Sequence, residues 1–136
     1  MLKAQIRKRL GELSLSIDLS VAKGITVLRG ESGSGKTTIA NLLSGALKPD
    51  EGEIELEGRS VFSTARSINL APEARGIGFV FQTARLLPHL SVEENIRFPQ
   101  TAGRRRPRVD FAEVVEILGL ERLLHRHPGS LSGGEG

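Results

Sequence analysis

Gly30-Glu31-Ser32-Gly33-Ser34-Gly35-Lys36-Thr37 is the stretch that decides how this chain folds and what it can bind. It fits the phosphate-binding pattern G-x-x-x-x-G-K-[ST] without a mismatch. Glycines in such a loop adopt backbone angles closed to other residues and leave N–H groups accessible to an anion. Lys36 supplies a point charge for outer phosphates, and Thr37 offers a hydroxyl to Mg²⁺. We therefore predict a phosphate site formed by Gly30, Glu31, Ser32, Gly33, Ser34, Gly35, Lys36, Thr37 and Thr38.

The residues on either side of this loop suit a phosphate site. Residues 25–28 (Ile-Thr-Val-Leu) are a β-rich apolar run and predict a buried strand that leads into the loop. Apolar residues at helical spacing follow the loop and predict a helix: Ile39, Leu42, Leu43, Ala46 and Leu47. The positive end of that helix faces the anion, and Pro49 is predicted to end it. The competing interpretation is a Gly-rich turn that matches the pattern by chance, which the strand and helix disfavour.

Composition narrows the class of protein. Of the 136 residues, 38% are hydrophobic and 26% are charged, the balance of an ordinary soluble protein. A net charge of +3 gives no argument for a nucleic-acid partner. No apolar run reaches the length of about 18 residues that spans a bilayer. The chain contains no cysteine, which excludes disulfides and thiolate metal sites and fits a cytoplasmic location.

The N-terminal half is predicted to consist of strands around the phosphate loop. Residues 2–10 mix apolar and basic side chains, and residues 13–21 alternate apolar with polar ones. These segments predict an antiparallel hairpin. Residues 53–57 alternate again and predict a further half-exposed strand, whereas residues 63–75 are predicted to be a loop.

A second buried strand is predicted over residues 76–81 (Gly-Ile-Gly-Phe-Val-Phe), ending at Gln82. We expect a parallel core sheet that carries the phosphate loop. An antiparallel β-subdomain is expected beside it, from residues 2–21 and 53–62. The predicted fold class is therefore α/β.

The pattern changes from strands to helices after Gln82. Two pairs have the spacing of a capping box: Ser91 with Glu94, and Asp110 with Glu113. Residues 111–118 carry apolar side chains on one face and predict a short helix closed by Gly119. Residues 101–108 form a basic loop, and residues 120–129 a polar connector. The basic loop suggests nucleic acid or acidic lipid, but a solvated surface loop is the simpler interpretation, and we predict no nucleic-acid partner.

Three features follow one another along the chain: the phosphate loop, a glutamine that closes a buried strand, and Leu131-Ser132-Gly133-Gly134-Glu135. In this order they resemble the ATP-binding subunits of ABC transporters, and the resemblance covers the whole chain. Leu-Ser-Gly-Gly followed by Gln or Glu is the signature motif of that family, and Gln82 stands at its Q-loop position. The resemblance implies a partial P-loop NTPase core over residues 1–82, including an antiparallel β-subdomain. It also implies a helical subdomain over residues 83–136 that ends at the signature.

The resemblance implies a site for ATP and Mg²⁺ that two copies share. In a head-to-tail homodimer, each ATP lies on the phosphate loop of one copy and under the signature of the other. Lys36 and Gln82 take the catalytic roles, and Thr37 with Gln82 holds Mg²⁺. Four residues of the opposing copy contact the γ-phosphate region: Ser132, Gly133, Gly134 and Glu135. Without the upstream motifs, a flexible tail with two glycines is the favoured interpretation of the signature. The alternative interpretation of Gln82 is a polar residue that ends a strand.

The resemblance further implies a transmembrane permease subunit as partner. Residues 84–90 resemble the surface that receives it, although Leu86, Leu87 and Leu90 suit a local core as well. Three stretches are similar to importer subunits for small oxyanions such as molybdate: 71–75, 78–82 and 85–89. Cargo specificity resides in the partner proteins. The subunit is expected to be cytoplasmic and peripheral on the cytoplasmic face of the membrane.

In that family, a strand ending in Asp-Glu and a histidine complete the catalytic site beyond the signature, and residues 1–136 contain neither. We therefore expect little or no ATP hydrolysis by the 136-residue chain itself. One alternative is a truncated, non-catalytic product that binds nucleotide or a partner. The other is an unrelated phosphate-loop enzyme such as a small-molecule kinase, which the signature disfavours. His125 and His127 lack the further ligands that a metal site needs.

Overall fold

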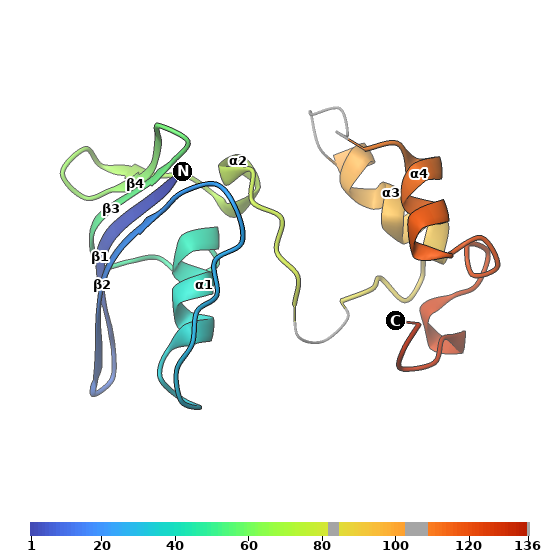
Figure 1. Ribbon diagram of the computed structural model, residues 1–136, viewed down its shortest axis with the longest axis horizontal. Helices are drawn as coiled ribbons and strands as arrows, with labels where there is room; N and C mark the ends of the chain where they lie inside the picture. Colours follow the sequence, from blue (N-terminus) through green and yellow to red (C-terminus); the bar gives the residue numbers. More distant parts are fainter. Residues whose placement is uncertain (82–84, 103–108, 136) are drawn as a thin grey trace. The chain divides into compact units, whose positions relative to one another are not determined.

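The computed structural model describes residues 1–81, 85–102 and 109–135, without the side chains of residues 99–102. The chain divides into two compact units, Met1–Phe79 (unit 1) and Val80–Gly136 (unit 2) (Figure 1). Within the described ranges, no helix has the length and apolar character needed to cross a membrane.

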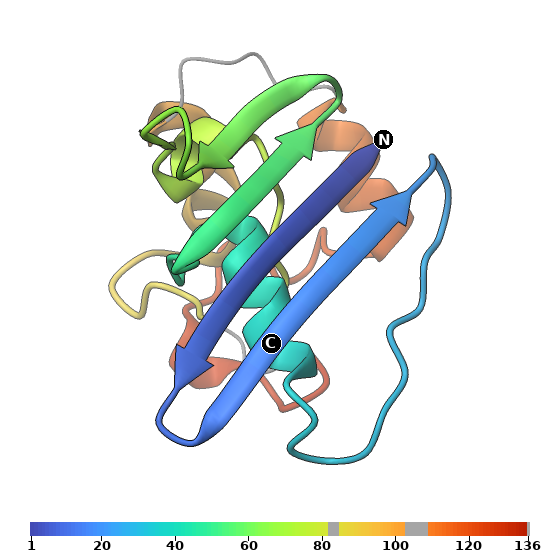
Figure 2. The same ribbon diagram turned by 90° about the vertical axis from the view of Figure 1, so that its left-hand side faces the viewer.

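Unit 1 is built on an antiparallel sheet (Figure 2). Its strands are β1 Leu2–Leu10, β2 Leu13–Val21, β3 Glu51–Leu56, β4 Arg59–Ser63 and β5 Ile68–Asn69. They lie side by side in the order β2-β1-β3-β4-β5, and every neighbouring pair is antiparallel. The β1–β2 hairpin pairs Leu10 with Leu13 at its turn and Leu2 with Val21 at its open end. The predicted hairpin and the strand predicted over residues 53–57 are confirmed.

Helix α1, Lys36–Ser44, lies across one face of this sheet and closes the core of unit 1 (Figure 2). Because side chains alternate along a strand, every second residue of β1 points toward the helix, including Ala4 and Ile6. The buried cluster consists of Ala4, Ile6, Leu42, Ile54, Val61 and Phe62. Burial of a large apolar side chain contributes about 1.5–3 kcal/mol. This cluster therefore holds α1, and the loop in front of it, on the sheet.

Helix α1 ends at Gly45, so the prediction that Pro49 ends it is wrong. Gly45 has a φ of +89°, and its N–H donates to the carbonyl oxygen of Asn41 at 3.1 Å. Glycine takes this left-handed angle without strain and commonly follows a helix for that reason. A Cβ at this position would lie 2.5 Å from Nε of Arg75. Gly45 therefore both turns the chain and makes room for a guanidinium group.

Arg75 is a buried cation, only 6% exposed, that fastens α1 to the segment beyond the sheet. Its guanidinium donates to four oxygens: those of Leu42 (3.1 Å), Leu43 (2.9 Å) and Leu70 (3.0 Å), and Oδ1 of Asn69 (3.3 Å). The first two are carbonyls of the last turn of α1, which lack an intrahelical partner and form the negative end of the helix dipole. Burial lowers the pKa of Arg75 below its usual value, yet a guanidinium stays charged at neutral pH.

The prediction that residues 63–75 form a loop is wrong in part. It contains the short strand β5 and the helix α2, Pro72–Arg75. Both are tied to α1 through the side chain of Arg75. Sequence patterns missed these elements because each is shorter than one period of a reliable signal.

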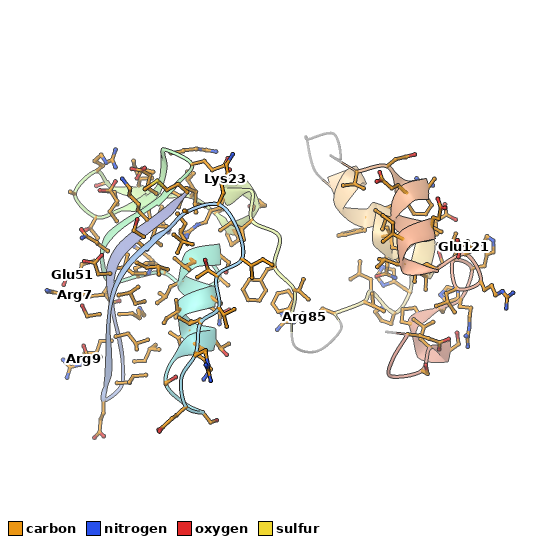
Figure 3. The ribbon with its side chains drawn as sticks, in the orientation of Figure 1. Arg7, Arg9, Lys23, Glu51, Arg85 and Glu121 are labelled. Carbon is orange, nitrogen blue, oxygen red and sulfur yellow. The ribbon has the colours of Figure 1, made fainter. Side chains whose placement is uncertain are left out.

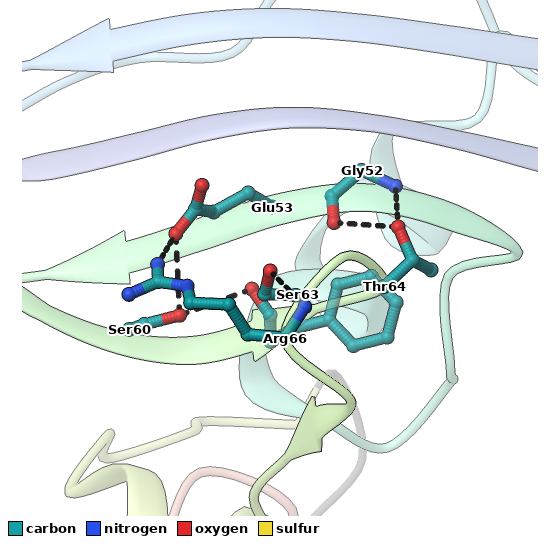
Figure 4. A network of polar contacts seen from close by, with 7 residues as sticks. Gly52, Glu53, Ser60, Ser63, Thr64 and Arg66 are labelled. Atoms are coloured by element: carbon teal, nitrogen blue, oxygen red, sulfur yellow. Dashed lines mark hydrogen bonds and ion pairs between the residues drawn. The ribbon is translucent and has the colours of Figure 1, made fainter.

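The face of the sheet opposite α1 is polar. Arg7 and Glu51 project from it, with Nη1 of Arg7 3.0 Å from Oε1 of Glu51 (Figure 3). Glu53 accepts a hydrogen bond from the Ser60 hydroxyl at 3.3 Å and pairs with Arg66 (Figure 4). Exposed pairs of this kind contribute little to stability, but they keep this face solvated.

Gly52 allows β3 to lie close to β1. Its φ is +109°, and a Cβ would stand 2.0 Å from the carbonyl oxygen of Gln5. The hydroxyl of Thr64 accepts from the Gly52 N–H at 3.1 Å and donates to the Gly52 carbonyl at 3.3 Å (Figure 4). Only glycine fits this position, because any side chain would collide with the neighbouring backbone.

The two strands predicted for a parallel core sheet are not formed. Residues 25–28 and 76–81 belong to no strand, and the exposed fraction reaches 96% at both Ile25 and Val80. A strand needs a neighbour to bond its backbone N–H and C=O groups, and none of the described strands pairs with either run. The sheet of the described residues is therefore antiparallel throughout, which corrects the prediction.

Unit 2 is helical. It contains α3 Val92–Ala102, α4 Phe111–Leu118 and a 3₁₀ turn over Pro128–Ser130. The capping box at the start of α3 is confirmed: the Ser91 N–H donates to Oε2 of Glu94 at 2.7 Å, and the Glu94 N–H to Oγ of Ser91 at 3.3 Å. The second pair is wrong, because Asp110 precedes α4 but makes no side-chain capping bond. Helix α4 ends at Gly119 as predicted.

The start of the predicted basic loop belongs to α3, which runs to Ala102. Residues 103–108 lie outside the described residues. Helices α3 and α4 meet where the guanidinium of Arg97 lies 3.6 Å from the ring centre of Phe111. A cation over an aromatic face is attracted by the ring quadrupole, and this contact therefore ties the two helices together.

Candidate functional site

The phosphate loop leads into α1 through two glycines with left-handed angles. The φ angles are +81° at Gly33 and +90° at Gly35. A Cβ at Gly30 would lie 2.7 Å from Oγ of Ser34. The Ser34 N–H donates to the carbonyl oxygen of Glu31 at 3.2 Å, which closes the turn. Gly33 and Gly35 are therefore required for the shape of the loop.

Lys36 reaches back across this loop from the first residue of α1. Its Nζ donates to the carbonyl oxygens of Gly30 at 2.8 Å and Glu31 at 2.6 Å, and to Oγ of Ser34 at 3.4 Å. The ammonium group thus lies within the curve of the loop and bonds neutral oxygens. These oxygens compete only weakly with an anionic ligand for the ammonium group. A phosphate oxygen carries a full charge and forms stronger bonds to an ammonium group than a carbonyl does. The geometry therefore suits an exchange of these carbonyls for a phosphate.

The N-terminus of α1 has donors for an anion and nothing acidic to compete. Gly35 occupies the N-capping position and has no side chain that could accept a hydrogen bond from the helix. The first turn holds no acidic residue. The first N–H groups of a helix lack intrahelical partners and form the positive end of the dipole. Thr37 lies on this turn with an exposed side chain, available to a cation. The residues present therefore fit a polyphosphate with its Mg²⁺.

The hairpin supports the loop from the side. A Cβ at Gly35 would lie 3.0 Å and 3.2 Å from the two methyl carbons of Leu15. Leu15 comes from β2 and is half-buried. Leu15, a residue of the sheet, thus fills the space beside Gly35. This contact fixes the position at which α1 begins.

Other predicted site residues lie elsewhere. Gln82, predicted to act in catalysis and on Mg²⁺, and Ala84 of the predicted permease surface lie outside the described residues. The signature residues Ser132, Gly133, Gly134 and Glu135 belong to unit 2. The strand expected to lead into the phosphate loop, residues 25–28, is not formed.

The signature forms a hydrogen-bonded turn. The Ser132 N–H donates to Oε2 of Glu135 at 2.7 Å, and the Glu135 N–H donates to the Ser132 carbonyl at 3.0 Å. Hydrogen bonds from the N–H and hydroxyl of Ser132 hold the pKa of Glu135 below its usual value. Gly133 and Gly134 are exposed, and a Cβ on either would meet nothing within 4 Å. Sequence analysis missed this turn, although Ser-Gly-Gly-Glu has the capping-box spacing.

Asn95 fixes the segment that resembles a permease-receiving surface. Its Oδ1 accepts from the Leu87 N–H at 2.7 Å. Its Nδ2 donates to the carbonyls of Leu87 (3.1 Å), Leu90 (3.1 Å) and Ser91 (2.9 Å). Leu87 and Leu90 are half-buried, whereas Leu86 is exposed. The three leucines thus divide between the local core and the surface.

Comparison with known proteins shows the family to which the chain belongs. Residues 14–136 match the protein family described as "ABC transporter". The chain belongs to the ABC transporter family. This member is 48% identical over 138 residues to the "Molybdenum import ATP-binding protein ModC" of Paramagnetospirillum magneticum, across 99% of its own length. It is 49% identical over 132 residues to the protein of the same name from Vibrio cholerae. It spans 38% and 35% of the lengths of these relatives.

Solved structures confirm the predicted fold class. A dimeric ATP-binding cassette in a post-hydrolysis state, bound to ADP and Pi, matches with a TM-score of 0.73 and 29% identity, covering 99% of this chain and 65% of that one. A nucleotide-free cassette from an ABC transporter matches with a TM-score of 0.73 and 29% identity over 98% of this chain and 59% of that one. The ABC transporter chain thus has part of the ATP-binding cassette fold, with an antiparallel β-subdomain and helices.

Proposed function

We propose that this chain is the nucleotide-binding part of an ABC importer's ATP-binding subunit, with the phosphates of ATP held by residues 30–38. The observation that carries the proposal is the position of Lys36, whose ammonium stands inside the loop on neutral oxygens at 2.6–2.8 Å. The uncapped start of α1 supplies N–H donors beside it. The nucleotide core extends over residues 1–82 and a helical subdomain over 83–136.

The residues of the loop have separate roles in this proposal. Lys36 exchanges the carbonyls of Gly30 and Glu31 for outer phosphate oxygens. The N–H groups around Gly33 and Gly35 surround the inner phosphates, and Thr37 with Gln82 orients the cation. Mg²⁺, when bound, neutralises the phosphate charge that the lysine and the helix terminus leave uncompensated. Catalysis by Lys36 and Gln82 requires that the attacking water be aligned with the γ-phosphate.

The signature is proposed to complete the site of a second copy. Ser132, Gly133, Gly134 and Glu135 form a tight turn, and its two glycines present backbone without side chains. Backbone of this kind can approach an anion closely. The solved cassette bound to ADP and Pi is described as dimeric, which supports a head-to-tail homodimer here.

Transport is proposed from the relatives. The name of these relatives, molybdenum import ATP-binding protein, supports a small oxyanion such as molybdate as cargo. It also supports a permease subunit as the membrane partner, contacted by residues 84–90 from the cytoplasmic face. Hydrolysis of Mg-ATP in this proposal requires, besides Lys36 and Gln82, the Asp-Glu strand and the histidine of the family, which residues 1–136 do not contain.

Equilibrium binding of Mg-ATP to the 136-residue chain tests the phosphate site. Lys36→Ala is expected to weaken binding about 10- to 100-fold, the effect of one charge-assisted hydrogen-bond group. Lys48→Ala is the matched control, because it removes the same charge from an exposed position beyond the other end of α1. Equal affinity for wild type and Lys36→Ala, or an equal loss in both variants, would overturn the proposal.

A further inference from the structure

Arg126 stands between the start of α3 and the signature turn. Its backbone carbonyl accepts the Val92 N–H at 2.9 Å, and its own N–H donates to the Leu123 carbonyl at 2.9 Å. Its guanidinium donates to the Ser130 carbonyl. Nη1 of the same group lies 3.6 Å from Oε1 of Glu135. One residue of the polar connector thus contacts both a helix terminus and the signature.

The helix terminus makes the anchor firm. Val92 and Glu93 carry N–H groups at the start of α3 that no intrahelical carbonyl can satisfy. They donate instead to the carbonyls of Arg126 and Leu124, the latter at 3.0 Å. Because these bonds satisfy orphan donors of a helix, breaking them has a penalty that a surface loop contact does not have. The backbone of the connector is therefore fixed where the Arg126 side chain leaves it.

The other end of the connection is the carboxylate of Glu135. That carboxylate already accepts the Ser132 N–H at 2.7 Å and so shapes the turn of the signature. Its side chain is 36% exposed, and that of Arg126 is 42% exposed. A half-exposed carboxylate without a partner samples several rotamers. The guanidinium of Arg126 lies beside the carboxylate that bonds Ser132.

We propose that Arg126 is a positioning residue for the signature motif. Anchored at the N-terminus of α3, it holds Glu135 in place and thereby sets the conformation of Ser132, Gly133 and Gly134. The functional meaning of this role rests on the proposed function, in which those residues contact the nucleotide of the opposing copy. The positioning itself is a property of this chain without nucleotide.

Amide hydrogen exchange of the 136-residue chain, resolved by NMR, tests the proposal. In Arg126→Ala, exchange at the Ser132 N–H is expected to accelerate about 2- to 5-fold, the effect of losing one exposed charge pair. Arg126→Lys keeps the charge and should restore part of the protection. Arg122→Ala removes an arginine from the same connector, one that makes no hydrogen bond or ion pair within the described ranges, and should leave Ser132 unchanged.

Two readouts separate positioning from a general loss of structure. The Leu120 N–H, which donates to the Val115 carbonyl at 3.0 Å, reports the folding of unit 2 and should exchange at the same rate in all variants. The carboxyl carbon of Glu135 should titrate at a higher pH in Arg126→Ala than in wild type and Arg126→Lys. The proposal is overturned if Ser132 exchange is unchanged in Arg126→Ala, or if Leu120 accelerates with it. If Mg-ATP binding did not depend on Lys36, the proposed function would be refuted. The positioning of Glu135 by Arg126 would still stand.

Discussion

Replacing Arg75 with methionine is expected to destabilise unit 1 by about 2–4 kcal/mol. Methionine keeps most of the length of the side chain but donates no hydrogen bond. The substitution leaves four oxygens without their donor, of which the carbonyls of Leu42, Leu43 and Leu70 belong to the backbone. Each buried acceptor left unpaired costs about 1–3 kcal/mol.

Three further effects set the size of this loss: two reduce it and one increases it. The bond to the Leu42 carbonyl is fully buried, whereas the other carbonyls can regain some hydration. Removing a buried cation that has no carboxylate partner among the described residues recovers part of its desolvation penalty. Loss of the positive charge at the C-terminal end of α1 lowers the stability of unit 1 by a further amount of about 0.3–1 kcal/mol. The balance is a loss near the middle of the stated range.

Urea unfolding followed by far-UV circular dichroism measures this change, and NMR signals of Ile54 and Phe62 assign the transition to unit 1. Arg59→Met is the matched control, because Arg59 is exposed and, among the described residues, its side chain donates only to the Ala74 carbonyl at 3.4 Å. It should change stability by no more than about 0.5 kcal/mol. The reasoning is refuted if Arg75→Met and Arg59→Met unfold at the same urea concentration.

Two further predictions concern the sheet and the start of α3. Gly52→Ala should destabilise unit 1 by about 3 kcal/mol or more, because its Cβ would meet the Gln5 carbonyl at 2.0 Å. Gly58→Ala, also at positive φ but with nothing within 4 Å of the new Cβ, should cost only about 1 kcal/mol in urea unfolding; equal losses would contradict the steric argument. Hydrogen bonds from the N–H and hydroxyl of Ser91 hold the pKa of Glu94 below its usual value, so the capping bond is intact above the usual glutamate range and is lost as pH falls through the lowered pKa. NMR titration of the Glu94 carboxyl should show a higher pKa in Ser91→Ala, where the N–H donor remains and the hydroxyl is gone, and an unchanged titration would contradict this assignment.

The sequence predicted those parts of the fold that depend on neighbours in the chain. The β1–β2 hairpin follows from the mixed apolar and basic residues 2–10 and the period-2 alternation of residues 13–21, on the two sides of a Gly-Glu turn. The capping box of Ser91 and Glu94 follows from spacing alone. The loop around Lys36 follows from a motif in which each residue has a defined conformational or chemical role.

Features that depend on contacts between residues far apart in the sequence were not predicted. The apolar runs at 25–28 and 76–81 have strand-like composition, but composition does not reveal whether a neighbouring strand takes up their backbone bonds. Arg75 was not predicted to be buried, because basic residues lie mostly at the surface. Its acceptors belong to α1, Asn69 and Leu70, and only the fold brings those carbonyls together. The role of Arg126 was invisible for the same reason.

The most direct test of the central claim is to map which backbone amides of the chain change their NMR shifts when Mg-ADP is added. The account predicts changes concentrated in residues 30–38, strongest near Gly33, Gly35 and Lys36, and their loss in Lys36→Ala. Adenosine, which has no phosphate, should produce none of them. Shifts that appear elsewhere in unit 1, that persist in Lys36→Ala, or that adenosine reproduces would contradict a phosphate site at this loop.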